Sequence, residues 1–525
     1  MSEHVNSANQ RQKGFSFTKW QPGRSFLSAI AVIVSALALA PLAGLLREGF
    51  QGLISGSMNL GIDGSRQILG TLTLLIFTGI LSAMVGTANG WLLANCRFPG
   101  RKFLRIAQLL PLATPAYLLS ATLIDLGSMN SIRIYGMSWG VLIMALTTYP
   151  YIFLLSTESF TKCGRRQLEA CRSLGVGPWN SFRRIALPMA LPAIGAGVAL
   201  TSMEVINELG AVELLNIPSI SAGIVESWVT NGSPSGAIAL AIIGLAIVMV
   251  LIAYERKLRA RSRRWTEGVA GGEAPSWELK GLRAFLAQSI AFIPPAFTLG
   301  TPLAWVLINI DQLGKGLDVE LLLLTSRSLG LGVAAASLTV IAALSLSIAK
   351  RWNKSRWMKS LTFLAGIGYA IPGAVLALGL FSFGGPPWKF TPLFLLLWGY
   401  SDRFLAVAKG GLDAAFERIS PNLDEAATGL GCKWQNVLTK IHLPLLKGPL
   451  GVGALLVFVD TLKELPLSFT LRPFDFDTLS VRIFQYAGDE RMSEAILPSL
   501  IILLLGLLAS VALIPGLESS ESVKR

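Results

Sequence analysis

Four acidic side chains occupy two matched places in apolar stretches of the sequence. Glu204 and Glu208 lie four residues apart near the end of one stretch, and Asp460 and Glu464 lie four residues apart near the end of another. Side chains at positions i and i+4 share one face of a helix. Carboxylate oxygens are the ligands that hard cations prefer, and charged groups inside apolar helices usually face a bundle interior or water. The spacing predicts that four carboxylates meet near one axis.

Three roles stay open for these carboxylates. They line a path for a cation, they dock an external binding protein, or they form structural ion pairs. The third role is suggested by Lys463, which lies three residues after Asp460, and by Arg472 nearby. A cation path made of carboxylates would repel an anion such as phosphate or sulfate. The pattern defines no firm set of metal ligands.

A further acidic residue recurs within a fixed pattern in two polar loops. The two copies are 256 positions apart and match at Glu169/Glu425, Ala170/Ala426, Gly175/Gly431 and Pro188/Pro444. The same offset relates the two carboxylate pairs. Each loop is predicted to be a short helix, a glycine in the left-handed conformation, a second short helix, and a proline in the first turn of the next long helix. A passive connector needs no fixed spacing, so the repeat predicts a functional surface.

Long apolar segments must position these residues. Only 14% of the 525 residues are charged, whereas soluble domains carry about 25%. A helix that spans a membrane needs about 20 mostly apolar residues. The sequence has twelve such runs, of which the fourth and tenth are short: Phe26–Leu46, Ile68–Leu93, Ile106–Leu126, Trp139–Leu155, Leu187–Leu215, Ala237–Tyr254, Phe285–Ile310, Leu329–Ala349, Leu361–Phe383, Thr391–Ala408, Leu443–Leu467 and Ile496–Ile514.

Basic residues predict the orientation of these runs. With the N-terminus inside, 35 of the 45 Lys and Arg residues fall on the inner side and 10 on the outer side. This asymmetry is typical of multi-pass membrane proteins and places both termini and both repeated loops in the cytoplasm. It also accounts for the net charge of +14 without nucleic acid. The basic block Arg256–Arg264 is interpreted as an anchor at anionic membrane lipid.

The predicted fold is an all-α integral membrane protein with about 12 transmembrane helices. They form two parallel six-helix repeats related by a pseudo-twofold axis. The predicted parts are a cytoplasmic tail (1–25), a first repeat (26–254, core about 66–254), a cytoplasmic linker (255–283), a second repeat (284–516, core about 326–514) and a second cytoplasmic tail (517–525).

The repeated loop resembles the EAA motif of type I ATP-binding-cassette importer permeases. That motif reads Glu-Ala-Ala, three residues, Gly, nine residues, Ile, one residue, Leu-Pro, and both copies fit it except that Cys171 replaces the second Ala in the first. The resemblance implies that each loop docks on a separate ATPase subunit. Glu169 and Glu425 would face that subunit. Two copies imply a fused pair of permease halves and two ATPase subunits.

A narrower resemblance concerns the substrate. The stretch Val459–Leu479 is similar to the K-E-L-P…L-R-P-F…T-L segment of ferric-iron permeases, and Pro111–Tyr117 and Ile371–Ala377 also resemble that family. The resemblance implies uptake of iron(III) across an inner membrane from a periplasmic iron-binding protein. Related permeases carry thiamine or aminoethylphosphonate, so these substrates stay open.

Other classes of function are weakly supported. The phosphate loop of an ATPase needs G-x4-G-K-[ST], and the one Gly-Lys step, Gly314-Lys315, is followed by glycine. The chain is therefore expected to bind no cofactor, with ATP used by a partner. Four cysteines without a pairing pattern support no disulfide framework or zinc site, and two histidines give no basis for a membrane enzyme. An ion-coupled secondary transporter accounts for twelve helices but not for the repeated loop.

Overall fold

The computed structural model describes residues 22–522 apart from 57, 61–62, 163–164, 233, 267–276, 317 and 385–388. The elements before the linker are α1 (Pro22–Ile54), α2 (Gly64–Asn95), β1 (Cys96–Arg97), α3 (Arg101–Ala107), η1 (Leu110–Ala113), α4 (Ala116–Met129), α5 (Met137–Lys162), α6 (Arg165–Ser173), α7 (Pro178–Ser181), η2 (Phe182–Ala186), α8 (Leu187–Asn207), α9 (Gly210–Leu214), α10 (Ile220–Val225), η3 (Glu226–Thr230) and α11 (Pro234–Thr266).

The remaining elements are β2 (Trp277–Glu278), α12 (Leu282–Ile308), η4 (Ile310–Gly316), α13 (Val319–Trp352), α14 (Arg356–Leu364), η5 (Ile367–Ala370), α15 (Gly373–Gly384), α16 (Pro392–Arg403), α17 (Leu405–Arg418), α18 (Pro421–Gly429), α19 (Trp434–Val437), η6 (Leu438–His442), α20 (Leu443–Lys463), α21 (Pro466–Leu471), α22 (Leu479–Gly488) and α23 (Met492–Ser522). The predicted tails and linker fall partly outside the described residues, at 1–21, 523–525 and 267–276.

The all-α membrane class is confirmed, but the twelve predicted spans are not all single helices. Within the described residues, nine helices are long and apolar enough to cross a membrane. Two further candidates are bent pairs, α3–η1 with α4 at 89° and α14–η5 with α15 at 116°. Each bend lies at a proline, Pro115 or Pro372. Proline has no N–H to donate and disfavours helical geometry in the residue before it, so an apolar run changes direction there.

The tenth predicted run is also divided. Thr391–Ala408 contains all of α16 and the start of α17, which meet at Phe404. Its repeat counterpart in the first half is a single helix, α5, which continues through Pro150. If each bent pair counts as one span, the described residues hold eleven candidates, and the divided tenth run is the predicted span that is missing.

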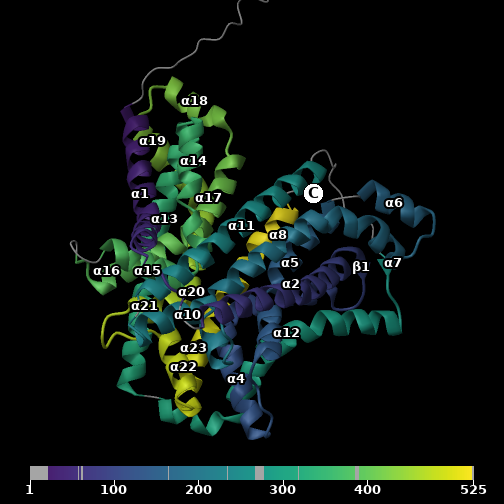
Figure 1. The fold of residues 1–525 in the computed structure, drawn as a ribbon. Helices are drawn as coiled ribbons and strands as arrows, with labels where there is room; N and C mark the ends of the chain where they lie inside the picture. Colours follow the sequence, from purple (N-terminus) through teal and green to yellow (C-terminus); the bar gives the residue numbers. More distant parts are fainter. Residues whose placement is uncertain are drawn as a thin grey trace, which may run out of the picture.

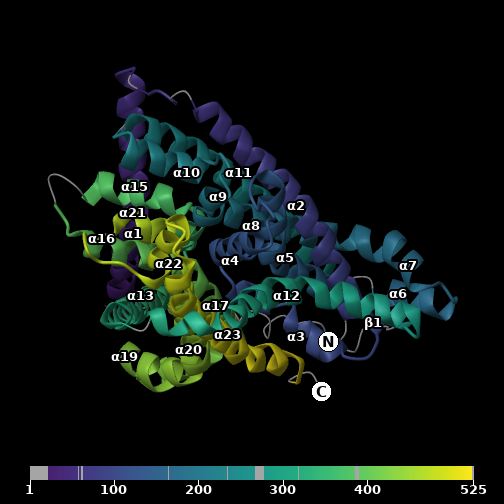
Figure 2. The same ribbon diagram turned by 90° about the horizontal axis from the view of Figure 1, so that it is seen from below.

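The first helix of each half packs against the other half. Helix α1 lies along α13, α14 and α15, whereas α12 lies along α2, α3, α4 and α5. Figures 1 and 2 show this exchange, with α1 beside the green second-half helices and α12 crossing the blue first-half helices. At the crossing of α1 and α15 the backbones are close, because a Cβ on Gly379 would lie 2.5 Å from the Pro41 carbonyl oxygen.

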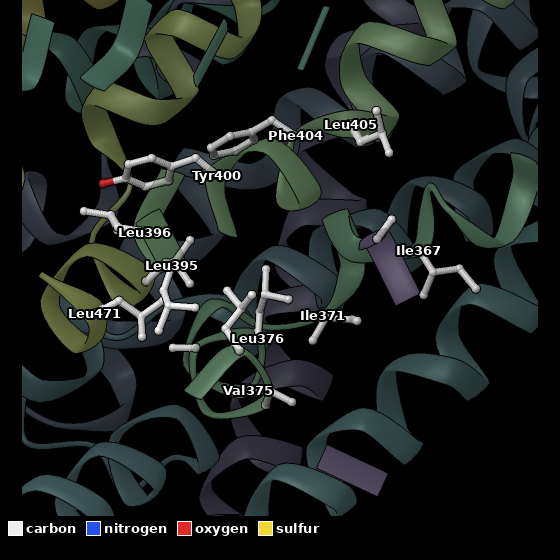
Figure 3. Packing of buried hydrophobic residues seen from close by; sticks show 14 of the residues in the cluster. Ile367, Ile371, Val375, Leu376, Leu395, Leu396, Tyr400, Phe404, Leu405 and Leu471 are labelled. Carbon is white, nitrogen blue, oxygen red and sulfur yellow. The ribbon is translucent and has the colours of Figure 1, made fainter. Parts of the chain in front are cut away.

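The largest buried cluster is built mainly from second-half helices together with α1, α10 and α11. Figure 3 shows part of it, where Val375 and Leu376 of α15 lie near Leu395 and Leu396 of α16 and Leu471 of α21. This packing holds α15, α16 and α21 together where the second half contacts the first. The linker is held to the first half by a two-residue parallel pairing of β1 with β2.

Candidate functional site

A cavity of about 120 Å³ lies between the two halves. All five residues predicted for the substrate path line it, and they come from the ends of α8 and α20. The lining comprises Pro111, Leu112, Thr114, Pro115, Ala116, Tyr117, Met144, Thr147, Thr148, Tyr151, Glu204, Asn207, Glu208, Tyr369, Arg403, Phe404, Asp460, Lys463, Glu464, Leu465 and Pro466. The four carboxylates that were predicted to meet all line this cavity.

Glu204 is bound by phenols from both halves. The Tyr151 hydroxyl of α5 donates to Glu204 Oε1 at 3.2 Å, and the Tyr369 hydroxyl of η5 donates to the same oxygen at 2.6 Å. All three side chains are half-buried. One carboxylate oxygen therefore joins α8 and α5 of the first half to η5 of the second.

Asp460, the repeat counterpart of Glu204, is held by a cation. Its Oδ1 lies 2.8 Å from Lys463 Nζ, so the pairing suggested by the sequence is present. Lys463 Nζ also donates to the Leu112 carbonyl oxygen at 3.2 Å. Arg472, the other basic residue considered for pairing, instead forms an ion pair with Asp477. The carboxylates at the two equivalent positions thus have different partners.

The second carboxylate of each pair does not share a helix face with the first, which corrects the i, i+4 prediction. Helices α8 and α20 end at Asn207 and Lys463, and the next residues, Glu208 and Glu464, have nearly identical extended backbones (φ/ψ of −69/127° and −69/123°). The helices end because both carboxylates turn to accept N–H groups of the following short helix. Glu208 accepts from Ala211 at 3.0 Å, and Glu464 accepts from the Leu467 and Ser468 amides at 3.1 Å.

Arg403 completes the charge set of the cavity. Its Nε lies 3.7 Å from Glu464 Oε1, with both side chains almost fully buried, and its Nη1 donates to the Ile371 carbonyl oxygen at 3.0 Å. Asp402, the residue before Arg403, forms no such contact, because among the described residues neither of its buried carboxylate oxygens has a hydrogen-bond partner.

Sequence reasoning missed several polar lining residues, among them Tyr151, Tyr369 and Asn207. Asn207 Oδ1 accepts the Gly373 amide at 2.7 Å and so fixes α8 against α15. The sequence feature that could have identified them is a polar side chain inside an otherwise apolar run. In the described part of the chain, no three His, Cys, Asp or Glu side chains are grouped so that they could hold a metal ion.

The two repeated loops have the predicted local structure. Each consists of a nine-residue helix, a glycine with positive φ, a four-residue helix and a π-helical turn that leads into a long helix. The glycines are Gly175 (φ 72°) and Gly431 (φ 78°). Pro188 and Pro444 occupy the first turn of α8 and α20, as predicted. Figure 1 shows α18 at the top and α6 at the right of the molecule, well apart.

Both loops have exposed side chains at equivalent positions on the molecular surface. Glu169 and Glu425 are exposed, as are Ala170 and Ala426. The leucine before each glycine is 80% exposed at Leu174 and 85% exposed at Leu430. An exposed large apolar side chain at repeat-equivalent positions is the pattern expected of a surface that a partner covers.

The two loops are anchored differently on their inner faces. Leu168 of α6 is fully buried in an apolar cluster, whereas its counterpart, Asp424 of α18, binds Arg351 Nε and His442 Nε2 at 2.7 Å each. Burial opposes ionisation of Asp424, but the hydrogen bonds from Arg351 and His442 outweigh it and hold the pKa of Asp424 below its usual value. Asp424 is therefore ionised at neutral pH and ties α18 to the ends of α13 and α20.

Comparison with known proteins bears on what this arrangement does. Residues 86–264, which contain the first loop, match the family described as binding-protein-dependent transport system inner membrane component. The molybdenum transport system permease protein ModB of Escherichia coli is 30% identical over 208 residues, covering 35% of this chain and 88% of ModB. The chain belongs to this permease family.

Two other relatives extend the comparison. The Fe(3+)-transport system permease protein FbpB 2 of Haemophilus influenzae is 26% identical over 447 residues, covering 81% of this chain and 85% of that protein. The sulfate transport system permease protein CysT of Escherichia coli is 29% identical over 203 residues, covering 35% of this chain and 72% of CysT. This permease is thus a multi-pass inner-membrane subunit of an ATP-binding-cassette importer, a class that works with an ATPase and a periplasmic binding protein.

Proposed function

We propose that this permease carries iron(III) from a periplasmic binding protein into the cytoplasm by alternating access, driven by two separate ATPase subunits. The observation that supports iron most is the alignment with FbpB 2, which is named for Fe(3+) and covers 81% of the chain. The alignments with ModB and CysT each cover 35% of the chain. A relative that matches over both halves is the better guide to the cavity between them.

The charges of the cavity favour a cation. Four carboxylates line it together with two basic side chains, Lys463 and Arg403. Each basic side chain is already close to a carboxylate, Lys463 to Asp460 and Arg403 to Glu464. Glu204 and Glu208 form no ion pair with a basic side chain of the described residues, which leaves an excess of negative charge. An oxyanion would be repelled by this excess, whereas a hard cation is attracted.

A second candidate is a permease for an oxyanion. The names of ModB and CysT favour it, as does the presence of Lys463 and Arg403 in the cavity. Thiamine and aminoethylphosphonate are further candidates from the sequence resemblance. These substrates differ in charge from iron(III), so a direct uptake measurement distinguishes them.

The coupling role is assigned to the two repeated loops. One ATPase copy docks at Glu169, Ala170 and Leu174, and the other docks at Glu425 and its neighbours. ATP is bound by the partner and not by this chain, whose own contacts are with the ATPase, the binding protein and membrane lipid and not with nucleic acid. Both termini lie in the cytoplasm, because the basic residues concentrate on that side.

Uptake into reconstituted vesicles tests the substrate. The permease is assembled with its ATPase, ATP is enclosed, and the binding protein is supplied outside with radioactive iron(III), molybdate, sulfate, thiamine or aminoethylphosphonate. We expect uptake of iron alone, dependent on ATP and on the binding protein. Uptake of an oxyanion without uptake of iron would replace the proposal with the second candidate.

A further inference from the structure

Two phenols from opposite halves converge on one carboxylate inside the cavity. Tyr151 and Glu204 belong to the first half, Tyr369 belongs to the second, and both hydroxyls donate to Glu204 Oε1. Asp460 of the second half lines the same cavity. We propose that Tyr151, Glu204, Tyr369 and Asp460 form a transient all-oxygen site for a trivalent cation, divided between the halves. The proposal deepens the iron(III) function and rests on it.

The donor set suits such a cation better than the carboxylates alone. No three acidic, histidine or cysteine side chains in the described residues are grouped to hold a metal. The phenols add two oxygens at the one carboxylate to which both are bound. Phenolate and carboxylate oxygens are hard ligands, and hard trivalent cations select them over nitrogen and sulfur.

A buried hydroxyl without a partner gives independent support for a ligand in this cavity. Tyr117 lines the cavity and is 2% exposed, yet among the described residues its hydroxyl has no hydrogen-bond partner. Leaving a buried donor unsatisfied costs about 1–3 kcal/mol. Such a group is expected where water or a bound ligand supplies the missing partner.

Binding of the cation releases protons, and the negative charge of the ligands compensates closely for the charge of the metal. When the cation binds, each phenol becomes a phenolate and releases one proton to water in the cavity. Two carboxylates and two phenolates then surround the three positive charges of the metal, so the bound site keeps one formal negative charge. Lys463 holds Asp460 Oδ1, which leaves Oδ2 for the cation. Close compensation of this kind is required because an uncompensated ion is costly away from bulk water.

Because the two halves share the site, the bound cation can be released when the halves separate. A transport site must bind well enough to accept its ion and weakly enough to let it go. Rocking of one repeat against the other is the usual form of alternating access. Since two donors are on α5 and α8 and two are on η5 and α20, separation of the halves removes half of the ligands. The same motion that opens the cavity to the cytoplasm thus lowers its affinity.

Visible absorption tests the site directly. The full chain, assembled with its ATPase in detergent, is titrated with iron(III) citrate. Phenolate bound to iron(III) produces a charge-transfer band that carboxylates do not. We expect the band in the native protein, a weaker band and at least about tenfold weaker iron binding in Tyr151→Phe and Tyr369→Phe, and no band in the double variant.

Tyr149→Phe is the matched control. Tyr149 lies on α5 two residues before Tyr151, is fully buried, and does not line the cavity. This variant should keep the full band. Co-purification with the ATPase and the thermal transition confirm that each variant is folded.

Absence of the band in the native protein at saturating iron, or its persistence in the double variant, would overturn the site. The native measurement does not depend on any variant folding. Iron uptake without a band leaves the proposed iron(III) function standing and removes only this site. A band in a protein that takes up no iron retains the cation site but removes the iron transport function.

Discussion

Glu464 shows how one residue of the cavity combines structure with charge. Its carboxylate accepts two backbone amides at the start of α21 and lies 3.7 Å from Arg403, and its side chain is 3% exposed. A buried ion pair of this kind is costly to break from one side, because the remaining charge has no compensation. Its counterpart Glu208 accepts the Ala211 amide of α9 and forms no ion pair within the described part of the chain.

The first prediction concerns this pair. Arg403→Met should destabilise the protein by about 3–5 kcal/mol, since it leaves Glu464 buried and uncompensated. The double variant Arg403→Met with Glu464→Gln should recover part of that loss, because no lone charge remains. Thermal and denaturant unfolding of the four proteins in one detergent gives the coupling energy. Additive effects of the two substitutions would show that the pair does not interact.

The second prediction concerns the two carboxylates at equivalent places on α8 and α20. Glu204→Gln and Asp460→Asn keep the shape but remove negative charge from the cavity. Each should lower iron uptake by at least about tenfold, equivalent to about 1.4 kcal/mol, with assembly of the ATPase unchanged. If these residues instead dock the binding protein, raising its concentration restores the rate. Normal uptake at every concentration would leave them a structural role only.

At the scale of elements, the turn in each cytoplasmic loop depends on one glycine. Gly175 and Gly431 have positive φ with open space around the missing Cβ, so backbone conformation is the main constraint there. Gly177, two residues along, also has open space but an ordinary extended backbone at φ −65°. The two positions therefore separate strain from steric fit.

The third prediction follows from that comparison. Gly175→Val should strain the turn by about 1–2 kcal/mol, shift Glu169 and Leu174, and lower the amount of ATPase that co-purifies. Gly431→Val should do the same at the second loop. Gly177→Val is the control and should retain the ATPase. Equal retention in all three variants would contradict the assignment of these loops as coupling elements.

The fourth prediction concerns the crossing of α1 with α15. Gly379→Ala places a Cβ 2.5 Å from the Pro41 carbonyl oxygen and should lower the thermal transition. Gly300 of α12 has open space, so Gly300→Ala should raise stability by up to about 1 kcal/mol through helix propensity. A stable Gly379→Ala protein would mean that α1 does not pack closely on the second half.

The sequence predicted some of these elements better than others, for physical reasons. The helix–glycine–helix loops were predictable because a positive φ, a helix end and a first-turn proline are local requirements. The bends at Pro115 and Pro372 were not, since the length of an apolar run does not reveal its direction. The charge pairs of the cavity required tertiary structure, because Arg403 and Glu464 are far apart in the chain.

Some residues that line the cavity have no similar residue at the equivalent position of the other repeat, so comparison of the repeats does not find them. The four carboxylates were found because each has an acidic counterpart 256 positions away. Tyr151 and Tyr369 have Val407 and Ala113 as counterparts, so a search for repeated residues passes over them. Two similar halves thus build a cavity whose lining is asymmetric, with phenols on Glu204 and an ammonium group on Asp460.

At the scale of the whole molecule, the exchanged packing of α1 and α12 joins the halves, and the cavity lies where they meet. The two repeated loops lie far apart, with α18 at the top and α6 at the right of Figure 1. Movement of either loop is therefore transmitted through α8 or α20, which run from the loop to the cavity. This geometry fits a transporter in which two motor subunits act on one site.

The fifth prediction concerns orientation in the membrane. In a chain whose native cysteines are replaced by serine, Asn231→Cys should react with an impermeant reagent applied from the periplasm. Lys280→Cys, whose position is 87% exposed, should react only after the membrane is opened. The reverse pattern would refute the orientation derived from the basic residues.

The central claim is that ATP hydrolysis by the two ATPase subunits, transmitted through the two loops, drives iron through the cavity. The most direct measurement is iron uptake together with ATP hydrolysis in vesicles that contain the permease and its ATPase, for the native chain and for Glu169→Ala with Glu425→Ala. We predict ATP-dependent uptake by the native chain and loss of uptake in the double variant, whose membrane portion remains folded. Uptake that persists in the double variant, or that runs on an ion gradient without ATP, would contradict the account.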